Sequence, residues 1–255
     1  MTSHLRRVVC QSIFVFAVAA ALVTSAAAQR GNIESVTFFT VKQDRVGDFQ
    51  AAVKELHAAY LKAGSTRYSS TWLSLSGPRE YALATYYEKW ADLDAGPDPK
   101  LKDDAADIAR ITTRILACTE GSRRIIAEIQ PDLSLHLATD MPKMIRVLTT
   151  DVRPEKYKDY LALVKSDILP AAQKGGLKLY EFSETRYGAP NTQVTSVVEM
   201  DAWGDLDGDF GVGKGLGKDG YQALLDKVRP LIEKAEVNEF RFEPDLSYLP
   251  PPTAK

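Results

Sequence analysis

Apolar and polar positions follow one another along the chain in a pattern that predicts the same series of elements twice. Segments rich in β-branched and aromatic residues predict strands, and apolar residues that recur every three or four positions predict amphipathic helices. The first series has the order strand, helix, strand, strand, helix, strand, at residues 33–41, 46–60, 67–75, 80–88, 101–118 and 123–129. The second series has the same order, at residues 144–152, 154–174, 177–187, 192–200, 221–235 and 236–242.

Glycine and proline mark the expected ends of the helices. Gly64 follows the first helix, and Gly175 and Gly176 follow its counterpart in the second series, where glycine commonly ends a helix. Pro154 suits the start of a helix because its φ angle is already helical. Pro230 lies inside the last predicted helix and should kink or split it.

Matching landmarks indicate that the two series are copies of one unit. The segment "EIQPDLS" (128–134) matches "RFEPDLS" (241–247), and "WADLD" (90–94) matches "WGDLD" (203–207) at the same offset. The first helices of the two copies align at a slightly smaller offset, with 42–54 matching 153–165. Self-similarity at a nearly fixed spacing is the signature of an internal duplication.

The repeated order of elements predicts the fold class. Strand–helix–strand–strand–helix–strand gives a four-stranded antiparallel sheet with two helices on one face, the ferredoxin-like arrangement. The other face also carries large apolar residues, among them Phe38, Trp72 and Tyr86, and these must be covered. We therefore predict an α+β protein in which two ferredoxin-like βαββαβ repeats pair sheet to sheet as a fused pseudo-dimeric α+β barrel.

The segment 1–28 has the features of a cleaved signal peptide. Arg6 and Arg7 precede an apolar run at 12–23, and small residues then offer a cleavage site after Ala28. The run is shorter than the roughly 20 apolar residues of a membrane-spanning helix, although an uncleaved anchor helix is the alternative. We expect a periplasmic or secreted protein that has no membrane contact after cleavage.

These boundaries predict the organisation of the whole chain. The signal peptide (1–28) is followed by a first barrel repeat (31–135), a linker (136–143), a second barrel repeat (144–250) and a tail (251–255).

Charge and cysteine content narrow the partners and the chemistry. The chain has 32 basic and 34 acidic residues with interspersed signs, which argues against a nucleic-acid partner because such proteins present a basic face. Cys118 is the single cysteine beyond the leader, so an exported chain has no internal disulfide. Packing alone must hold the fold.

An aromatic–acid–tryptophan turn after the third strand of each copy resembles a known superfamily. The segments "YYEKWADLDA" and "VEMDAWGDLD" are similar to those of the dimeric α+β barrels, which include antibiotic-biosynthesis monooxygenases and NIPSNAP proteins. In that superfamily two units form one barrel, so the tandem chain resembles a fused dimer. The resemblance implies a monomer (a pseudo-dimer) or a weak homo-oligomer.

The same resemblance bears on activity. Haem-degrading members use an Asn on the first strand and a His on the second helix; Asn32 lies near that strand, but 101–118 contains no His. Cofactor-free monooxygenases of the superfamily surround an apolar substrate with Asn, Trp and Tyr or Arg, and Trp72, Arg67 and Tyr86 are of these types. We expect no cofactor.

The glycine-rich run "GDFGVGKGLGKDG" (208–220) is similar to a phosphate-binding loop, but the context disagrees. Such a loop follows a strand directly and opens a helix, whereas here residues 201–207 intervene and Gly215 stands where a Ser or Thr is needed. We expect a flexible flap over the barrel mouth instead. The aspartates at 205, 207 and 209 have a calcium-loop spacing but lack its later Gly and Glu, so we expect a polar turn and no metal site.

Few residues with catalytic side chains remain. His57 is a weak catalytic candidate because its counterpart in the second copy is Ile168. It is either an acid–base group or a haem ligand inside the barrel, or a packing histidine at the helix–sheet boundary. His136, in the linker, is expected on the surface. Trp90 and Trp203 recur at equivalent positions and are expected to be packing anchors.

These residues leave three functions open. An exported barrel could bind a small apolar molecule between its two sheets, with Trp72, Tyr86, Arg67 and Tyr180 as the ligand-binding candidates. A cofactor-independent monooxygenase or isomerase could act in the same cavity. An envelope or stress protein could use the barrel as a scaffold with no ligand.

Overall fold

The computed structural model describes residues 31–94, 98–137 and 140–250. The predicted signal peptide (1–28) and tail (251–255) lie outside the described residues. The strands are β1 (Ile33–Val41), β2 (Ser69–Ser74), β3 (Glu80–Tyr87), β4 (Thr119–Ile129), β5 (Leu135–His136), β6 (Met144–Val152), β7 (Leu179–Tyr187), β8 (Gln193–Met200) and β9 (Ile232–Phe242). The α-helices are α1 (Val46–Ala63), α2 (Ala91–Asp94), α3 (Ala105–Ala117), α4 (Tyr157–Leu163), α5 (Leu169–Lys174) and α6 (Gly211–Val228).

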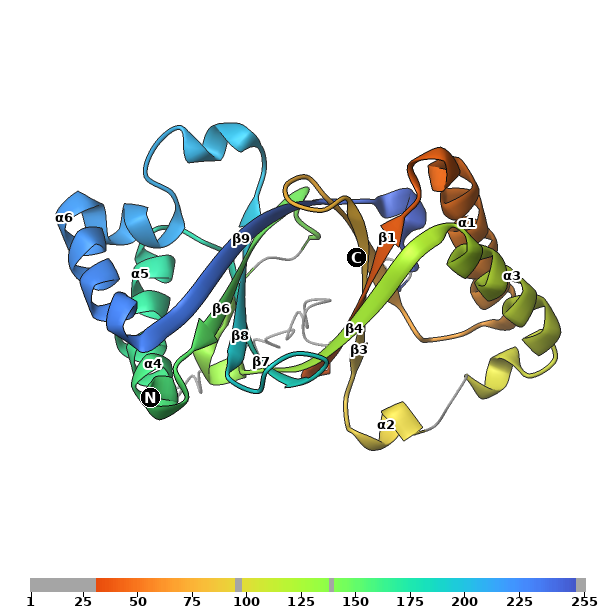
Figure 1. Ribbon diagram of the computed structural model, residues 1–255, viewed down its shortest axis with the longest axis horizontal. Coiled ribbons are helices and arrows are strands. Elements are labelled where there is room, and N and C mark those ends of the chain that lie inside the picture. Colours follow the sequence, from red (N-terminus) through yellow and green to blue (C-terminus); the bar gives the residue numbers. More distant parts are fainter. Residues whose placement is uncertain (1–30, 95–97, 138–139, 251–255) are drawn as a thin grey trace, which may run out of the picture.

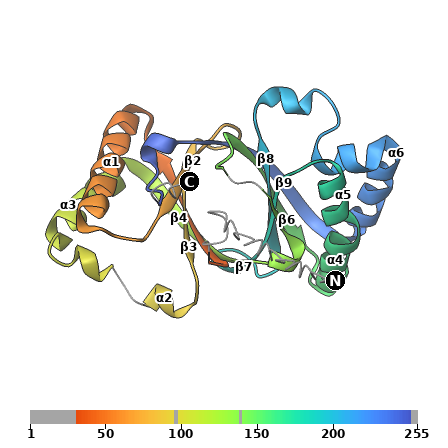
Figure 2. The ribbon, with the colours of Figure 1, turned by 180° about the vertical axis from the view of Figure 1, so that it is seen from behind.

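The strands close into one antiparallel barrel, which confirms the predicted fold class. Neighbouring strands follow the order β4–β1–β3–β2–β9–β6–β8–β7, and β7 pairs in turn with β4. The short β5 extends the edge of β7. The sheets of the two repeats therefore join along their edges, at two equivalent seams, β2–β9 and β4–β7. Figures 1 and 2 show the helices of each repeat covering opposite outer sides of this barrel.

The repeated Pro-Asp-Leu-Ser segments lie at the seams, where each fastens one repeat onto the other. We call residues 131–134 and 244–247 the clip segments; each forms a 3₁₀ turn followed by its serine. The Phe182 N–H donates to Ser134 Oγ at 3.0 Å, and the Thr71 N–H donates to Ser247 Oγ at 2.8 Å. In both cases the serine accepts from a strand of the other repeat.

The leucine of each clip segment is buried in the other repeat. Leu133 packs into the core beneath the helices of the second repeat, with Tyr160 and Phe182. Leu246 packs into the corresponding core of the first repeat, with Phe49 and Tyr81. Each repeat thus completes the hydrophobic core of its partner, and this explains why the segment recurs in both copies.

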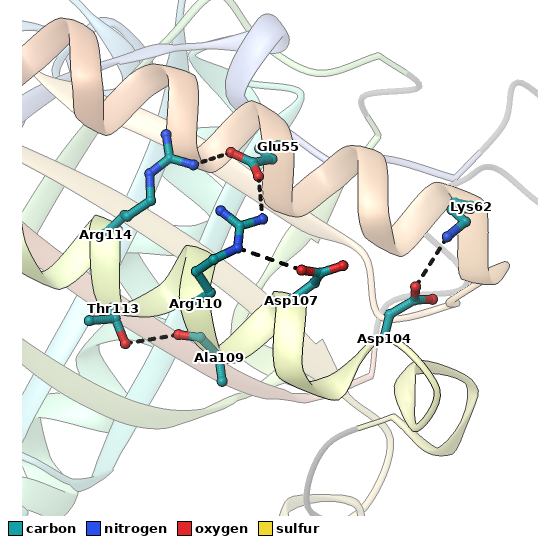
Figure 3. A network of polar contacts seen from close by, with 8 residues as sticks. All are labelled: Glu55, Lys62, Asp104, Asp107, Ala109, Arg110, Thr113 and Arg114. Carbon is teal, nitrogen blue, oxygen red and sulfur yellow. Dashed lines mark hydrogen bonds and ion pairs between the residues drawn. The ribbon is translucent and has the colours of Figure 1, made fainter.

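Ion pairs connect the helices of the first repeat (Figure 3). Arg110 and Arg114 of α3 both hydrogen-bond the carboxylate of Glu55 on α1, Arg110 at 2.9 Å. These two guanidinium groups hold the pKa of Glu55 below its usual value. Lys62 pairs with Asp104 at 3.1 Å near the end of α1.

Glycines connect the helices of the second repeat. A Cβ atom added at Gly215 of α6 would lie 2.0 Å from the carbonyl oxygen of Ala171 on α5, and one added at Gly175 would lie 2.0 Å from the carbonyl oxygen of Gly211. The two backbones touch directly, and side chains larger than hydrogen do not fit between them. The glycine-rich run therefore serves helix packing, and the expectation of a flexible flap over the mouth was wrong.

Prolines account for two differences from the predicted helices. The helix expected at 154–174 contains a π-helical segment (Val164–Ile168) in the turn before Pro170, because proline lacks the N–H of a regular turn and crowds the preceding one. The helix expected at 221–235 ends before Pro230, and 232–235 belong to β9. In the part of the chain that is described, no helix has the length and apolar character needed to cross a bilayer.

Candidate functional site

Hydrophobic side chains from both repeats meet inside the barrel. They alternate along the strands with residues that face the helices, such as Leu73 and Tyr81. We call the inward-facing group the interior cluster. Its buried members are Trp72, Ala82, Ile145 and Phe240, and Val36, Phe38, Met141, Val147, Val197 and Phe242 pack against them.

Aromatic rings dominate the contacts of this cluster. The rings of Trp72 and Phe242 lie 5.1 Å apart across the β2–β9 seam. Phe38 of the first repeat and Phe240 of the second are 6.5 Å apart, although β3 and β2 separate their strands in the sheet. The indole N–H of Trp72 donates to Ser70 Oγ at 3.0 Å. The interior is therefore aromatic, with its single indole donor already satisfied.

A charged pair lies beside these rings in the first repeat. Arg123 of β4 sits opposite Phe38 of β1, and its guanidinium carbon lies 3.7 Å from the centre of the Phe38 ring. The same guanidinium donates to Glu80 at 2.8 Å, and the Thr40 hydroxyl donates to Glu80 at 3.3 Å. Arg123 thus combines a cation–π contact with an ion pair, and its charge is already partnered.

A histidine–carboxylate pair lies at the other seam. Tyr180 faces the helices of the second repeat, so its neighbours on β7, Leu179 and Glu181, face the interior. Opposite Glu181 on β8 is Val197 of the interior cluster. His136 of β5 pairs with Leu179, and its Nε2 lies 3.2 Å from a carboxylate oxygen of Glu181. The Glu181 side chain is 7% exposed and that of His136 is 33% exposed, so the pair runs from a buried acid to an accessible imidazole.

The structure brings two of the predicted site residues to the interior side of the barrel. Trp72 is in the interior cluster, and Tyr86 lies on the same face of β3 as Ala82, opposite Glu34. Tyr180 instead contacts Ser196 through its hydroxyl at 3.1 Å on the helix side, where burial raises the pKa of the phenol.

Arg67 and His57 lie together outside the barrel. Arg67 precedes β2 and is close to Tyr60 of α1. His57 is 8% exposed and stacks on Tyr248, with ring centres 6.0 Å apart. Its Nδ1 has no hydrogen-bond partner among the described residues. Burial lowers the pKa of His57 to about 4, so the imidazole is neutral at pH 7.

A shallow pocket of about 270 Å³ adjoins this group of rings. It is lined by Leu61, Gly64, Ser65, Thr66, Tyr68, Tyr248 and Leu249. Tyr248, which stacks on His57, is one of the lining residues, so His57 lies behind the wall of a surface pocket at the end of α1.

The two repeated tryptophans do not serve as packing anchors. Trp90 is 39% exposed and Trp203 is 49% exposed. The Trp90 ring contacts Tyr187 edge to face at 5.8 Å, which is a surface contact because Tyr187 is also exposed. The expectation that both would be packing anchors was wrong.

The aspartates after β8 form a polar turn. Asp205 accepts hydrogen bonds from the backbone N–H groups of Asp201 and Ala202, and these bonds hold the pKa of Asp205 below its usual value. Within residues 31–94, 98–137 and 140–250, no three His, Cys, Asp or Glu side chains are placed to hold a metal ion.

Solved structures contain the same barrel. A candidate monooxygenase from Fusobacterium nucleatum superimposes with a TM-score of 0.57 at 14% identity, covering 82% of this chain and 91% of that chain. An anthrone oxidase-like protein gives 0.56 at 14% identity, with coverages of 86% and 93%. A chlorite dismutase from Candidatus Nitrospira defluvii, in complex with imidazole, gives 0.53 at 11% identity, with coverages of 86% and 94%. This chain has the fold of the dimeric α+β barrels.

Sequence comparison adds nothing to this likeness. No protein-family model matches the chain, and no curated protein matches it. At these identities the structural similarity establishes the barrel, and the chemistry has to be argued from the barrel's own residues.

The sequence did not identify the His136–Glu181 pair of this barrel. His136 was expected on the surface and is exposed, but the sequence did not predict that β5 carries it across the seam onto β7. One signal was available: Glu181 aligns with Ser70 in the first copy, so a charge on an inward-facing strand position breaks the symmetry of the repeats.

Proposed function

We propose that the barrel binds a small, largely aromatic molecule between its two sheets. The observation that carries the proposal is the interior cluster, in which Trp72, Phe38, Phe240 and Phe242 from both repeats converge. Ligand sites are predominantly hydrophobic and aromatic, with a few polar groups that set orientation. Arg123 and His136 are the polar groups that border the cluster.

Trp72 provides a direct test. It is the one buried tryptophan of three, so the double variant Trp90→Phe/Trp203→Phe leaves a single interior reporter. We expect anilinonaphthalene sulfonate to quench Trp72 emission with saturation. Native mass spectrometry of the purified chain should then show whether a small molecule co-purifies and is displaced by the probe.

A matched pair of variants separates interior binding from surface binding. Phe240→Leu removes an aromatic ring from the interior, whereas Phe210→Leu removes one that packs on the helix side of the second repeat. We expect the first variant to weaken binding about fivefold, since one aromatic contact contributes roughly 1 kcal/mol, and the second to leave it unchanged. Equal effects, or no saturable quenching, would support the scaffold alternative.

A second candidate function is a cofactor-independent oxygenase acting in the same interior. The names of two structural neighbours, a candidate monooxygenase and an anthrone oxidase-like protein, favour it. Anthrone is the natural probe, because its oxidation consumes one O₂ and yields anthraquinone and water. Oxygen uptake above the uncatalysed rate that is lost on Phe240→Leu would support this candidate.

We also propose that the chain is exported and acts as a monomer. The support is the leader-like composition of 1–28 and a barrel that one chain closes by itself. Protein recovered from the periplasm should begin at Gln29, and light scattering should give the mass of one chain. The finer likeness to NIPSNAP proteins, suggested by the turns after β3 and β8, is likewise a proposal.

A further inference from the structure

The two seams of the barrel differ at a pair of aligned positions. At the β4–β7 seam these positions hold His136 and Glu181. Alignment of the clip segments matches His136 with Leu249, and alignment of the first helices and the strands after them matches Glu181 with Ser70. One seam therefore carries an acid and an imidazole where the other carries an aliphatic side chain and a small hydroxyl.

The buried acid fixes how the histidine is oriented. Glu181 is a carboxylate with little access to water, and such a group requires a hydrogen-bond donor. Nε2 of His136 lies 3.2 Å from a carboxylate oxygen of Glu181, close enough to pair with it. A neutral imidazole that donates from Nε2 has a lone pair on Nδ1. His136 is the more exposed side chain of the pair, at 33% against 7% for Glu181.

The neighbouring charged group is already occupied. Glu199 of β8 lies beside Leu179, and its carboxylate accepts the backbone N–H groups of Lys178 and Leu179. Glu199 therefore fixes the backbone at the start of β7, and the carboxylate that pairs with His136 is that of Glu181. Met141, which follows shortly after His136 in the chain, packs against the interior cluster.

We propose that His136, oriented by Glu181, accepts a proton from an acidic hydroxyl of the bound molecule, so that the ligand is a phenol or an enol. The inference rests on the proposed binding function and specifies the class of ligand. The O–H bond breaks, an N–H bond forms at Nδ1, and the electron pair stays on the ligand oxygen as a phenolate or enolate. Glu181 balances the resulting imidazolium charge, and no oxidant or metal takes part.

The test uses para-nitrophenol, because its phenolate is yellow and its neutral form is nearly colourless. In the Trp90→Phe/Trp203→Phe background, Trp72 quenching reports occupancy of the interior, and visible absorption reports the protonation state of the bound probe. A facing imidazolium should raise the phenolate-to-phenol ratio of bound probe about tenfold over free probe at a pH below its pKa.

Matched variants assign that shift to the pair. His136→Leu combined with Glu181→Ser installs the residues of the other seam and should abolish the spectral shift while quenching persists. His136→Gln can still donate to Glu181 but takes no proton, so it should have the same effect if the double variant does not fold. Leu249→Ala, at the position of the other seam that aligns with His136, should leave the shift unchanged.

Each outcome separates this inference from the proposed function. A shift that survives in His136→Gln overturns the role of His136. Quenching by anilinonaphthalene sulfonate but not by para-nitrophenol overturns the phenol class and leaves the binding function standing. Saturable quenching by neither probe overturns both.

Discussion

The two halves of the barrel share their strand order and clip segments and differ in how their helices pack and in their inward-facing residues. Each half forms the same strand order and sends a clip segment into the other. The helix layers, in contrast, are joined by ion pairs of Glu55 in the first half and by direct backbone contact at Gly215 in the second. Closure of the barrel therefore depends on the strand order and the clip segments, which both copies retain. The contacts between the helices differ from one copy to the other.

The two copies also differ at positions that face the interior of the barrel. Trp72 in the first copy corresponds to Ser183 in the second, and Ser70 corresponds to Glu181. A pseudo-symmetric barrel needs neither difference in order to close. Residues that break the symmetry at inward-facing positions are thus the ones to test for ligand contact, whereas the shared clip residues should affect stability alone.

The largest expected effect comes from the clip leucines. Leu246 is 2% exposed in the core of the first half, so Leu246→Ala should lower the free energy of unfolding by about 4 kcal/mol, through lost burial and the cavity left behind. Leu133 is slightly more exposed, and Leu133→Ala should cost less. Urea unfolding of both variants measures the difference. A loss below about 1 kcal/mol for Leu246→Ala would contradict the view that each half completes the core of the other.

The next largest effect concerns His57, which lies on the first helix of the first half where the second half has Ile168. His57 has a folded-state pKa of about 4, below its usual value of 6.5, because it is buried. The unfolded chain then binds the extra proton first, so stability falls as pH drops from 6.5 to 4 and changes no further below that. The loss should be on the order of 3 kcal/mol.

The control replaces His57 by the residue of the other half. His57→Ile should remove this part of the pH dependence, and the difference between the two unfolding curves isolates it from carboxylates that titrate near pH 4. Parallel curves for the two proteins between pH 6.5 and pH 4 would mean that the imidazole is protonated in the folded state.

A glycine pair tests the helix layer of the second half. Gly215→Ala would force a Cβ against the carbonyl oxygen of Ala171, and such overpacking typically costs about 1–3 kcal/mol. Gly213, two residues earlier, has only the Tyr221 ring at 3.9 Å beyond its Cβ position. Gly213→Ala should therefore stabilise by up to about 1 kcal/mol, because alanine favours helix. Thermal unfolding that moves in the same direction for both would contradict a direct backbone contact.

The sequence predicted most of the barrel because local patterns specify its elements. β1 and β6 have the predicted bounds, and Gly64 ends α1 with a φ of 65°. The end of α6 was predicted wrongly, because residues 232–235 belong to β9 and pair with the last residues of β6, 150–152. That partner lies far earlier in the sequence, so the local pattern of 232–235 does not reveal it.

The candidate site was harder to predict, because it forms where the repeats cross. His136 reaches Glu181 only once β5 pairs with β7, and no local periodicity encodes contacts between the two copies. The duplication also led to a wrong prediction: Trp90 and Trp203 recur at equivalent positions, but both are exposed and neither is a packing anchor. The clip segments were found because they recur in both copies. The interior residues of interest are those at which the two copies differ.

The smallest expected effect comes from the clip serines, which test whether the two seams contribute equally to the free energy of unfolding. Ser247→Ala removes the acceptor of the Thr71 N–H, and Ser134→Ala removes that of the Phe182 N–H. Each variant leaves a buried backbone donor without a partner and should cost roughly 1–3 kcal/mol, with the two values alike because the clip geometry is alike. Unfolding of the single and double variants should show additive losses, since the seams lie on opposite sides of the barrel. Unequal costs would mean that the seam carrying His136 and Glu181 draws part of its stability from that pair, and the difference should then vanish in the His136→Leu/Glu181→Ser background.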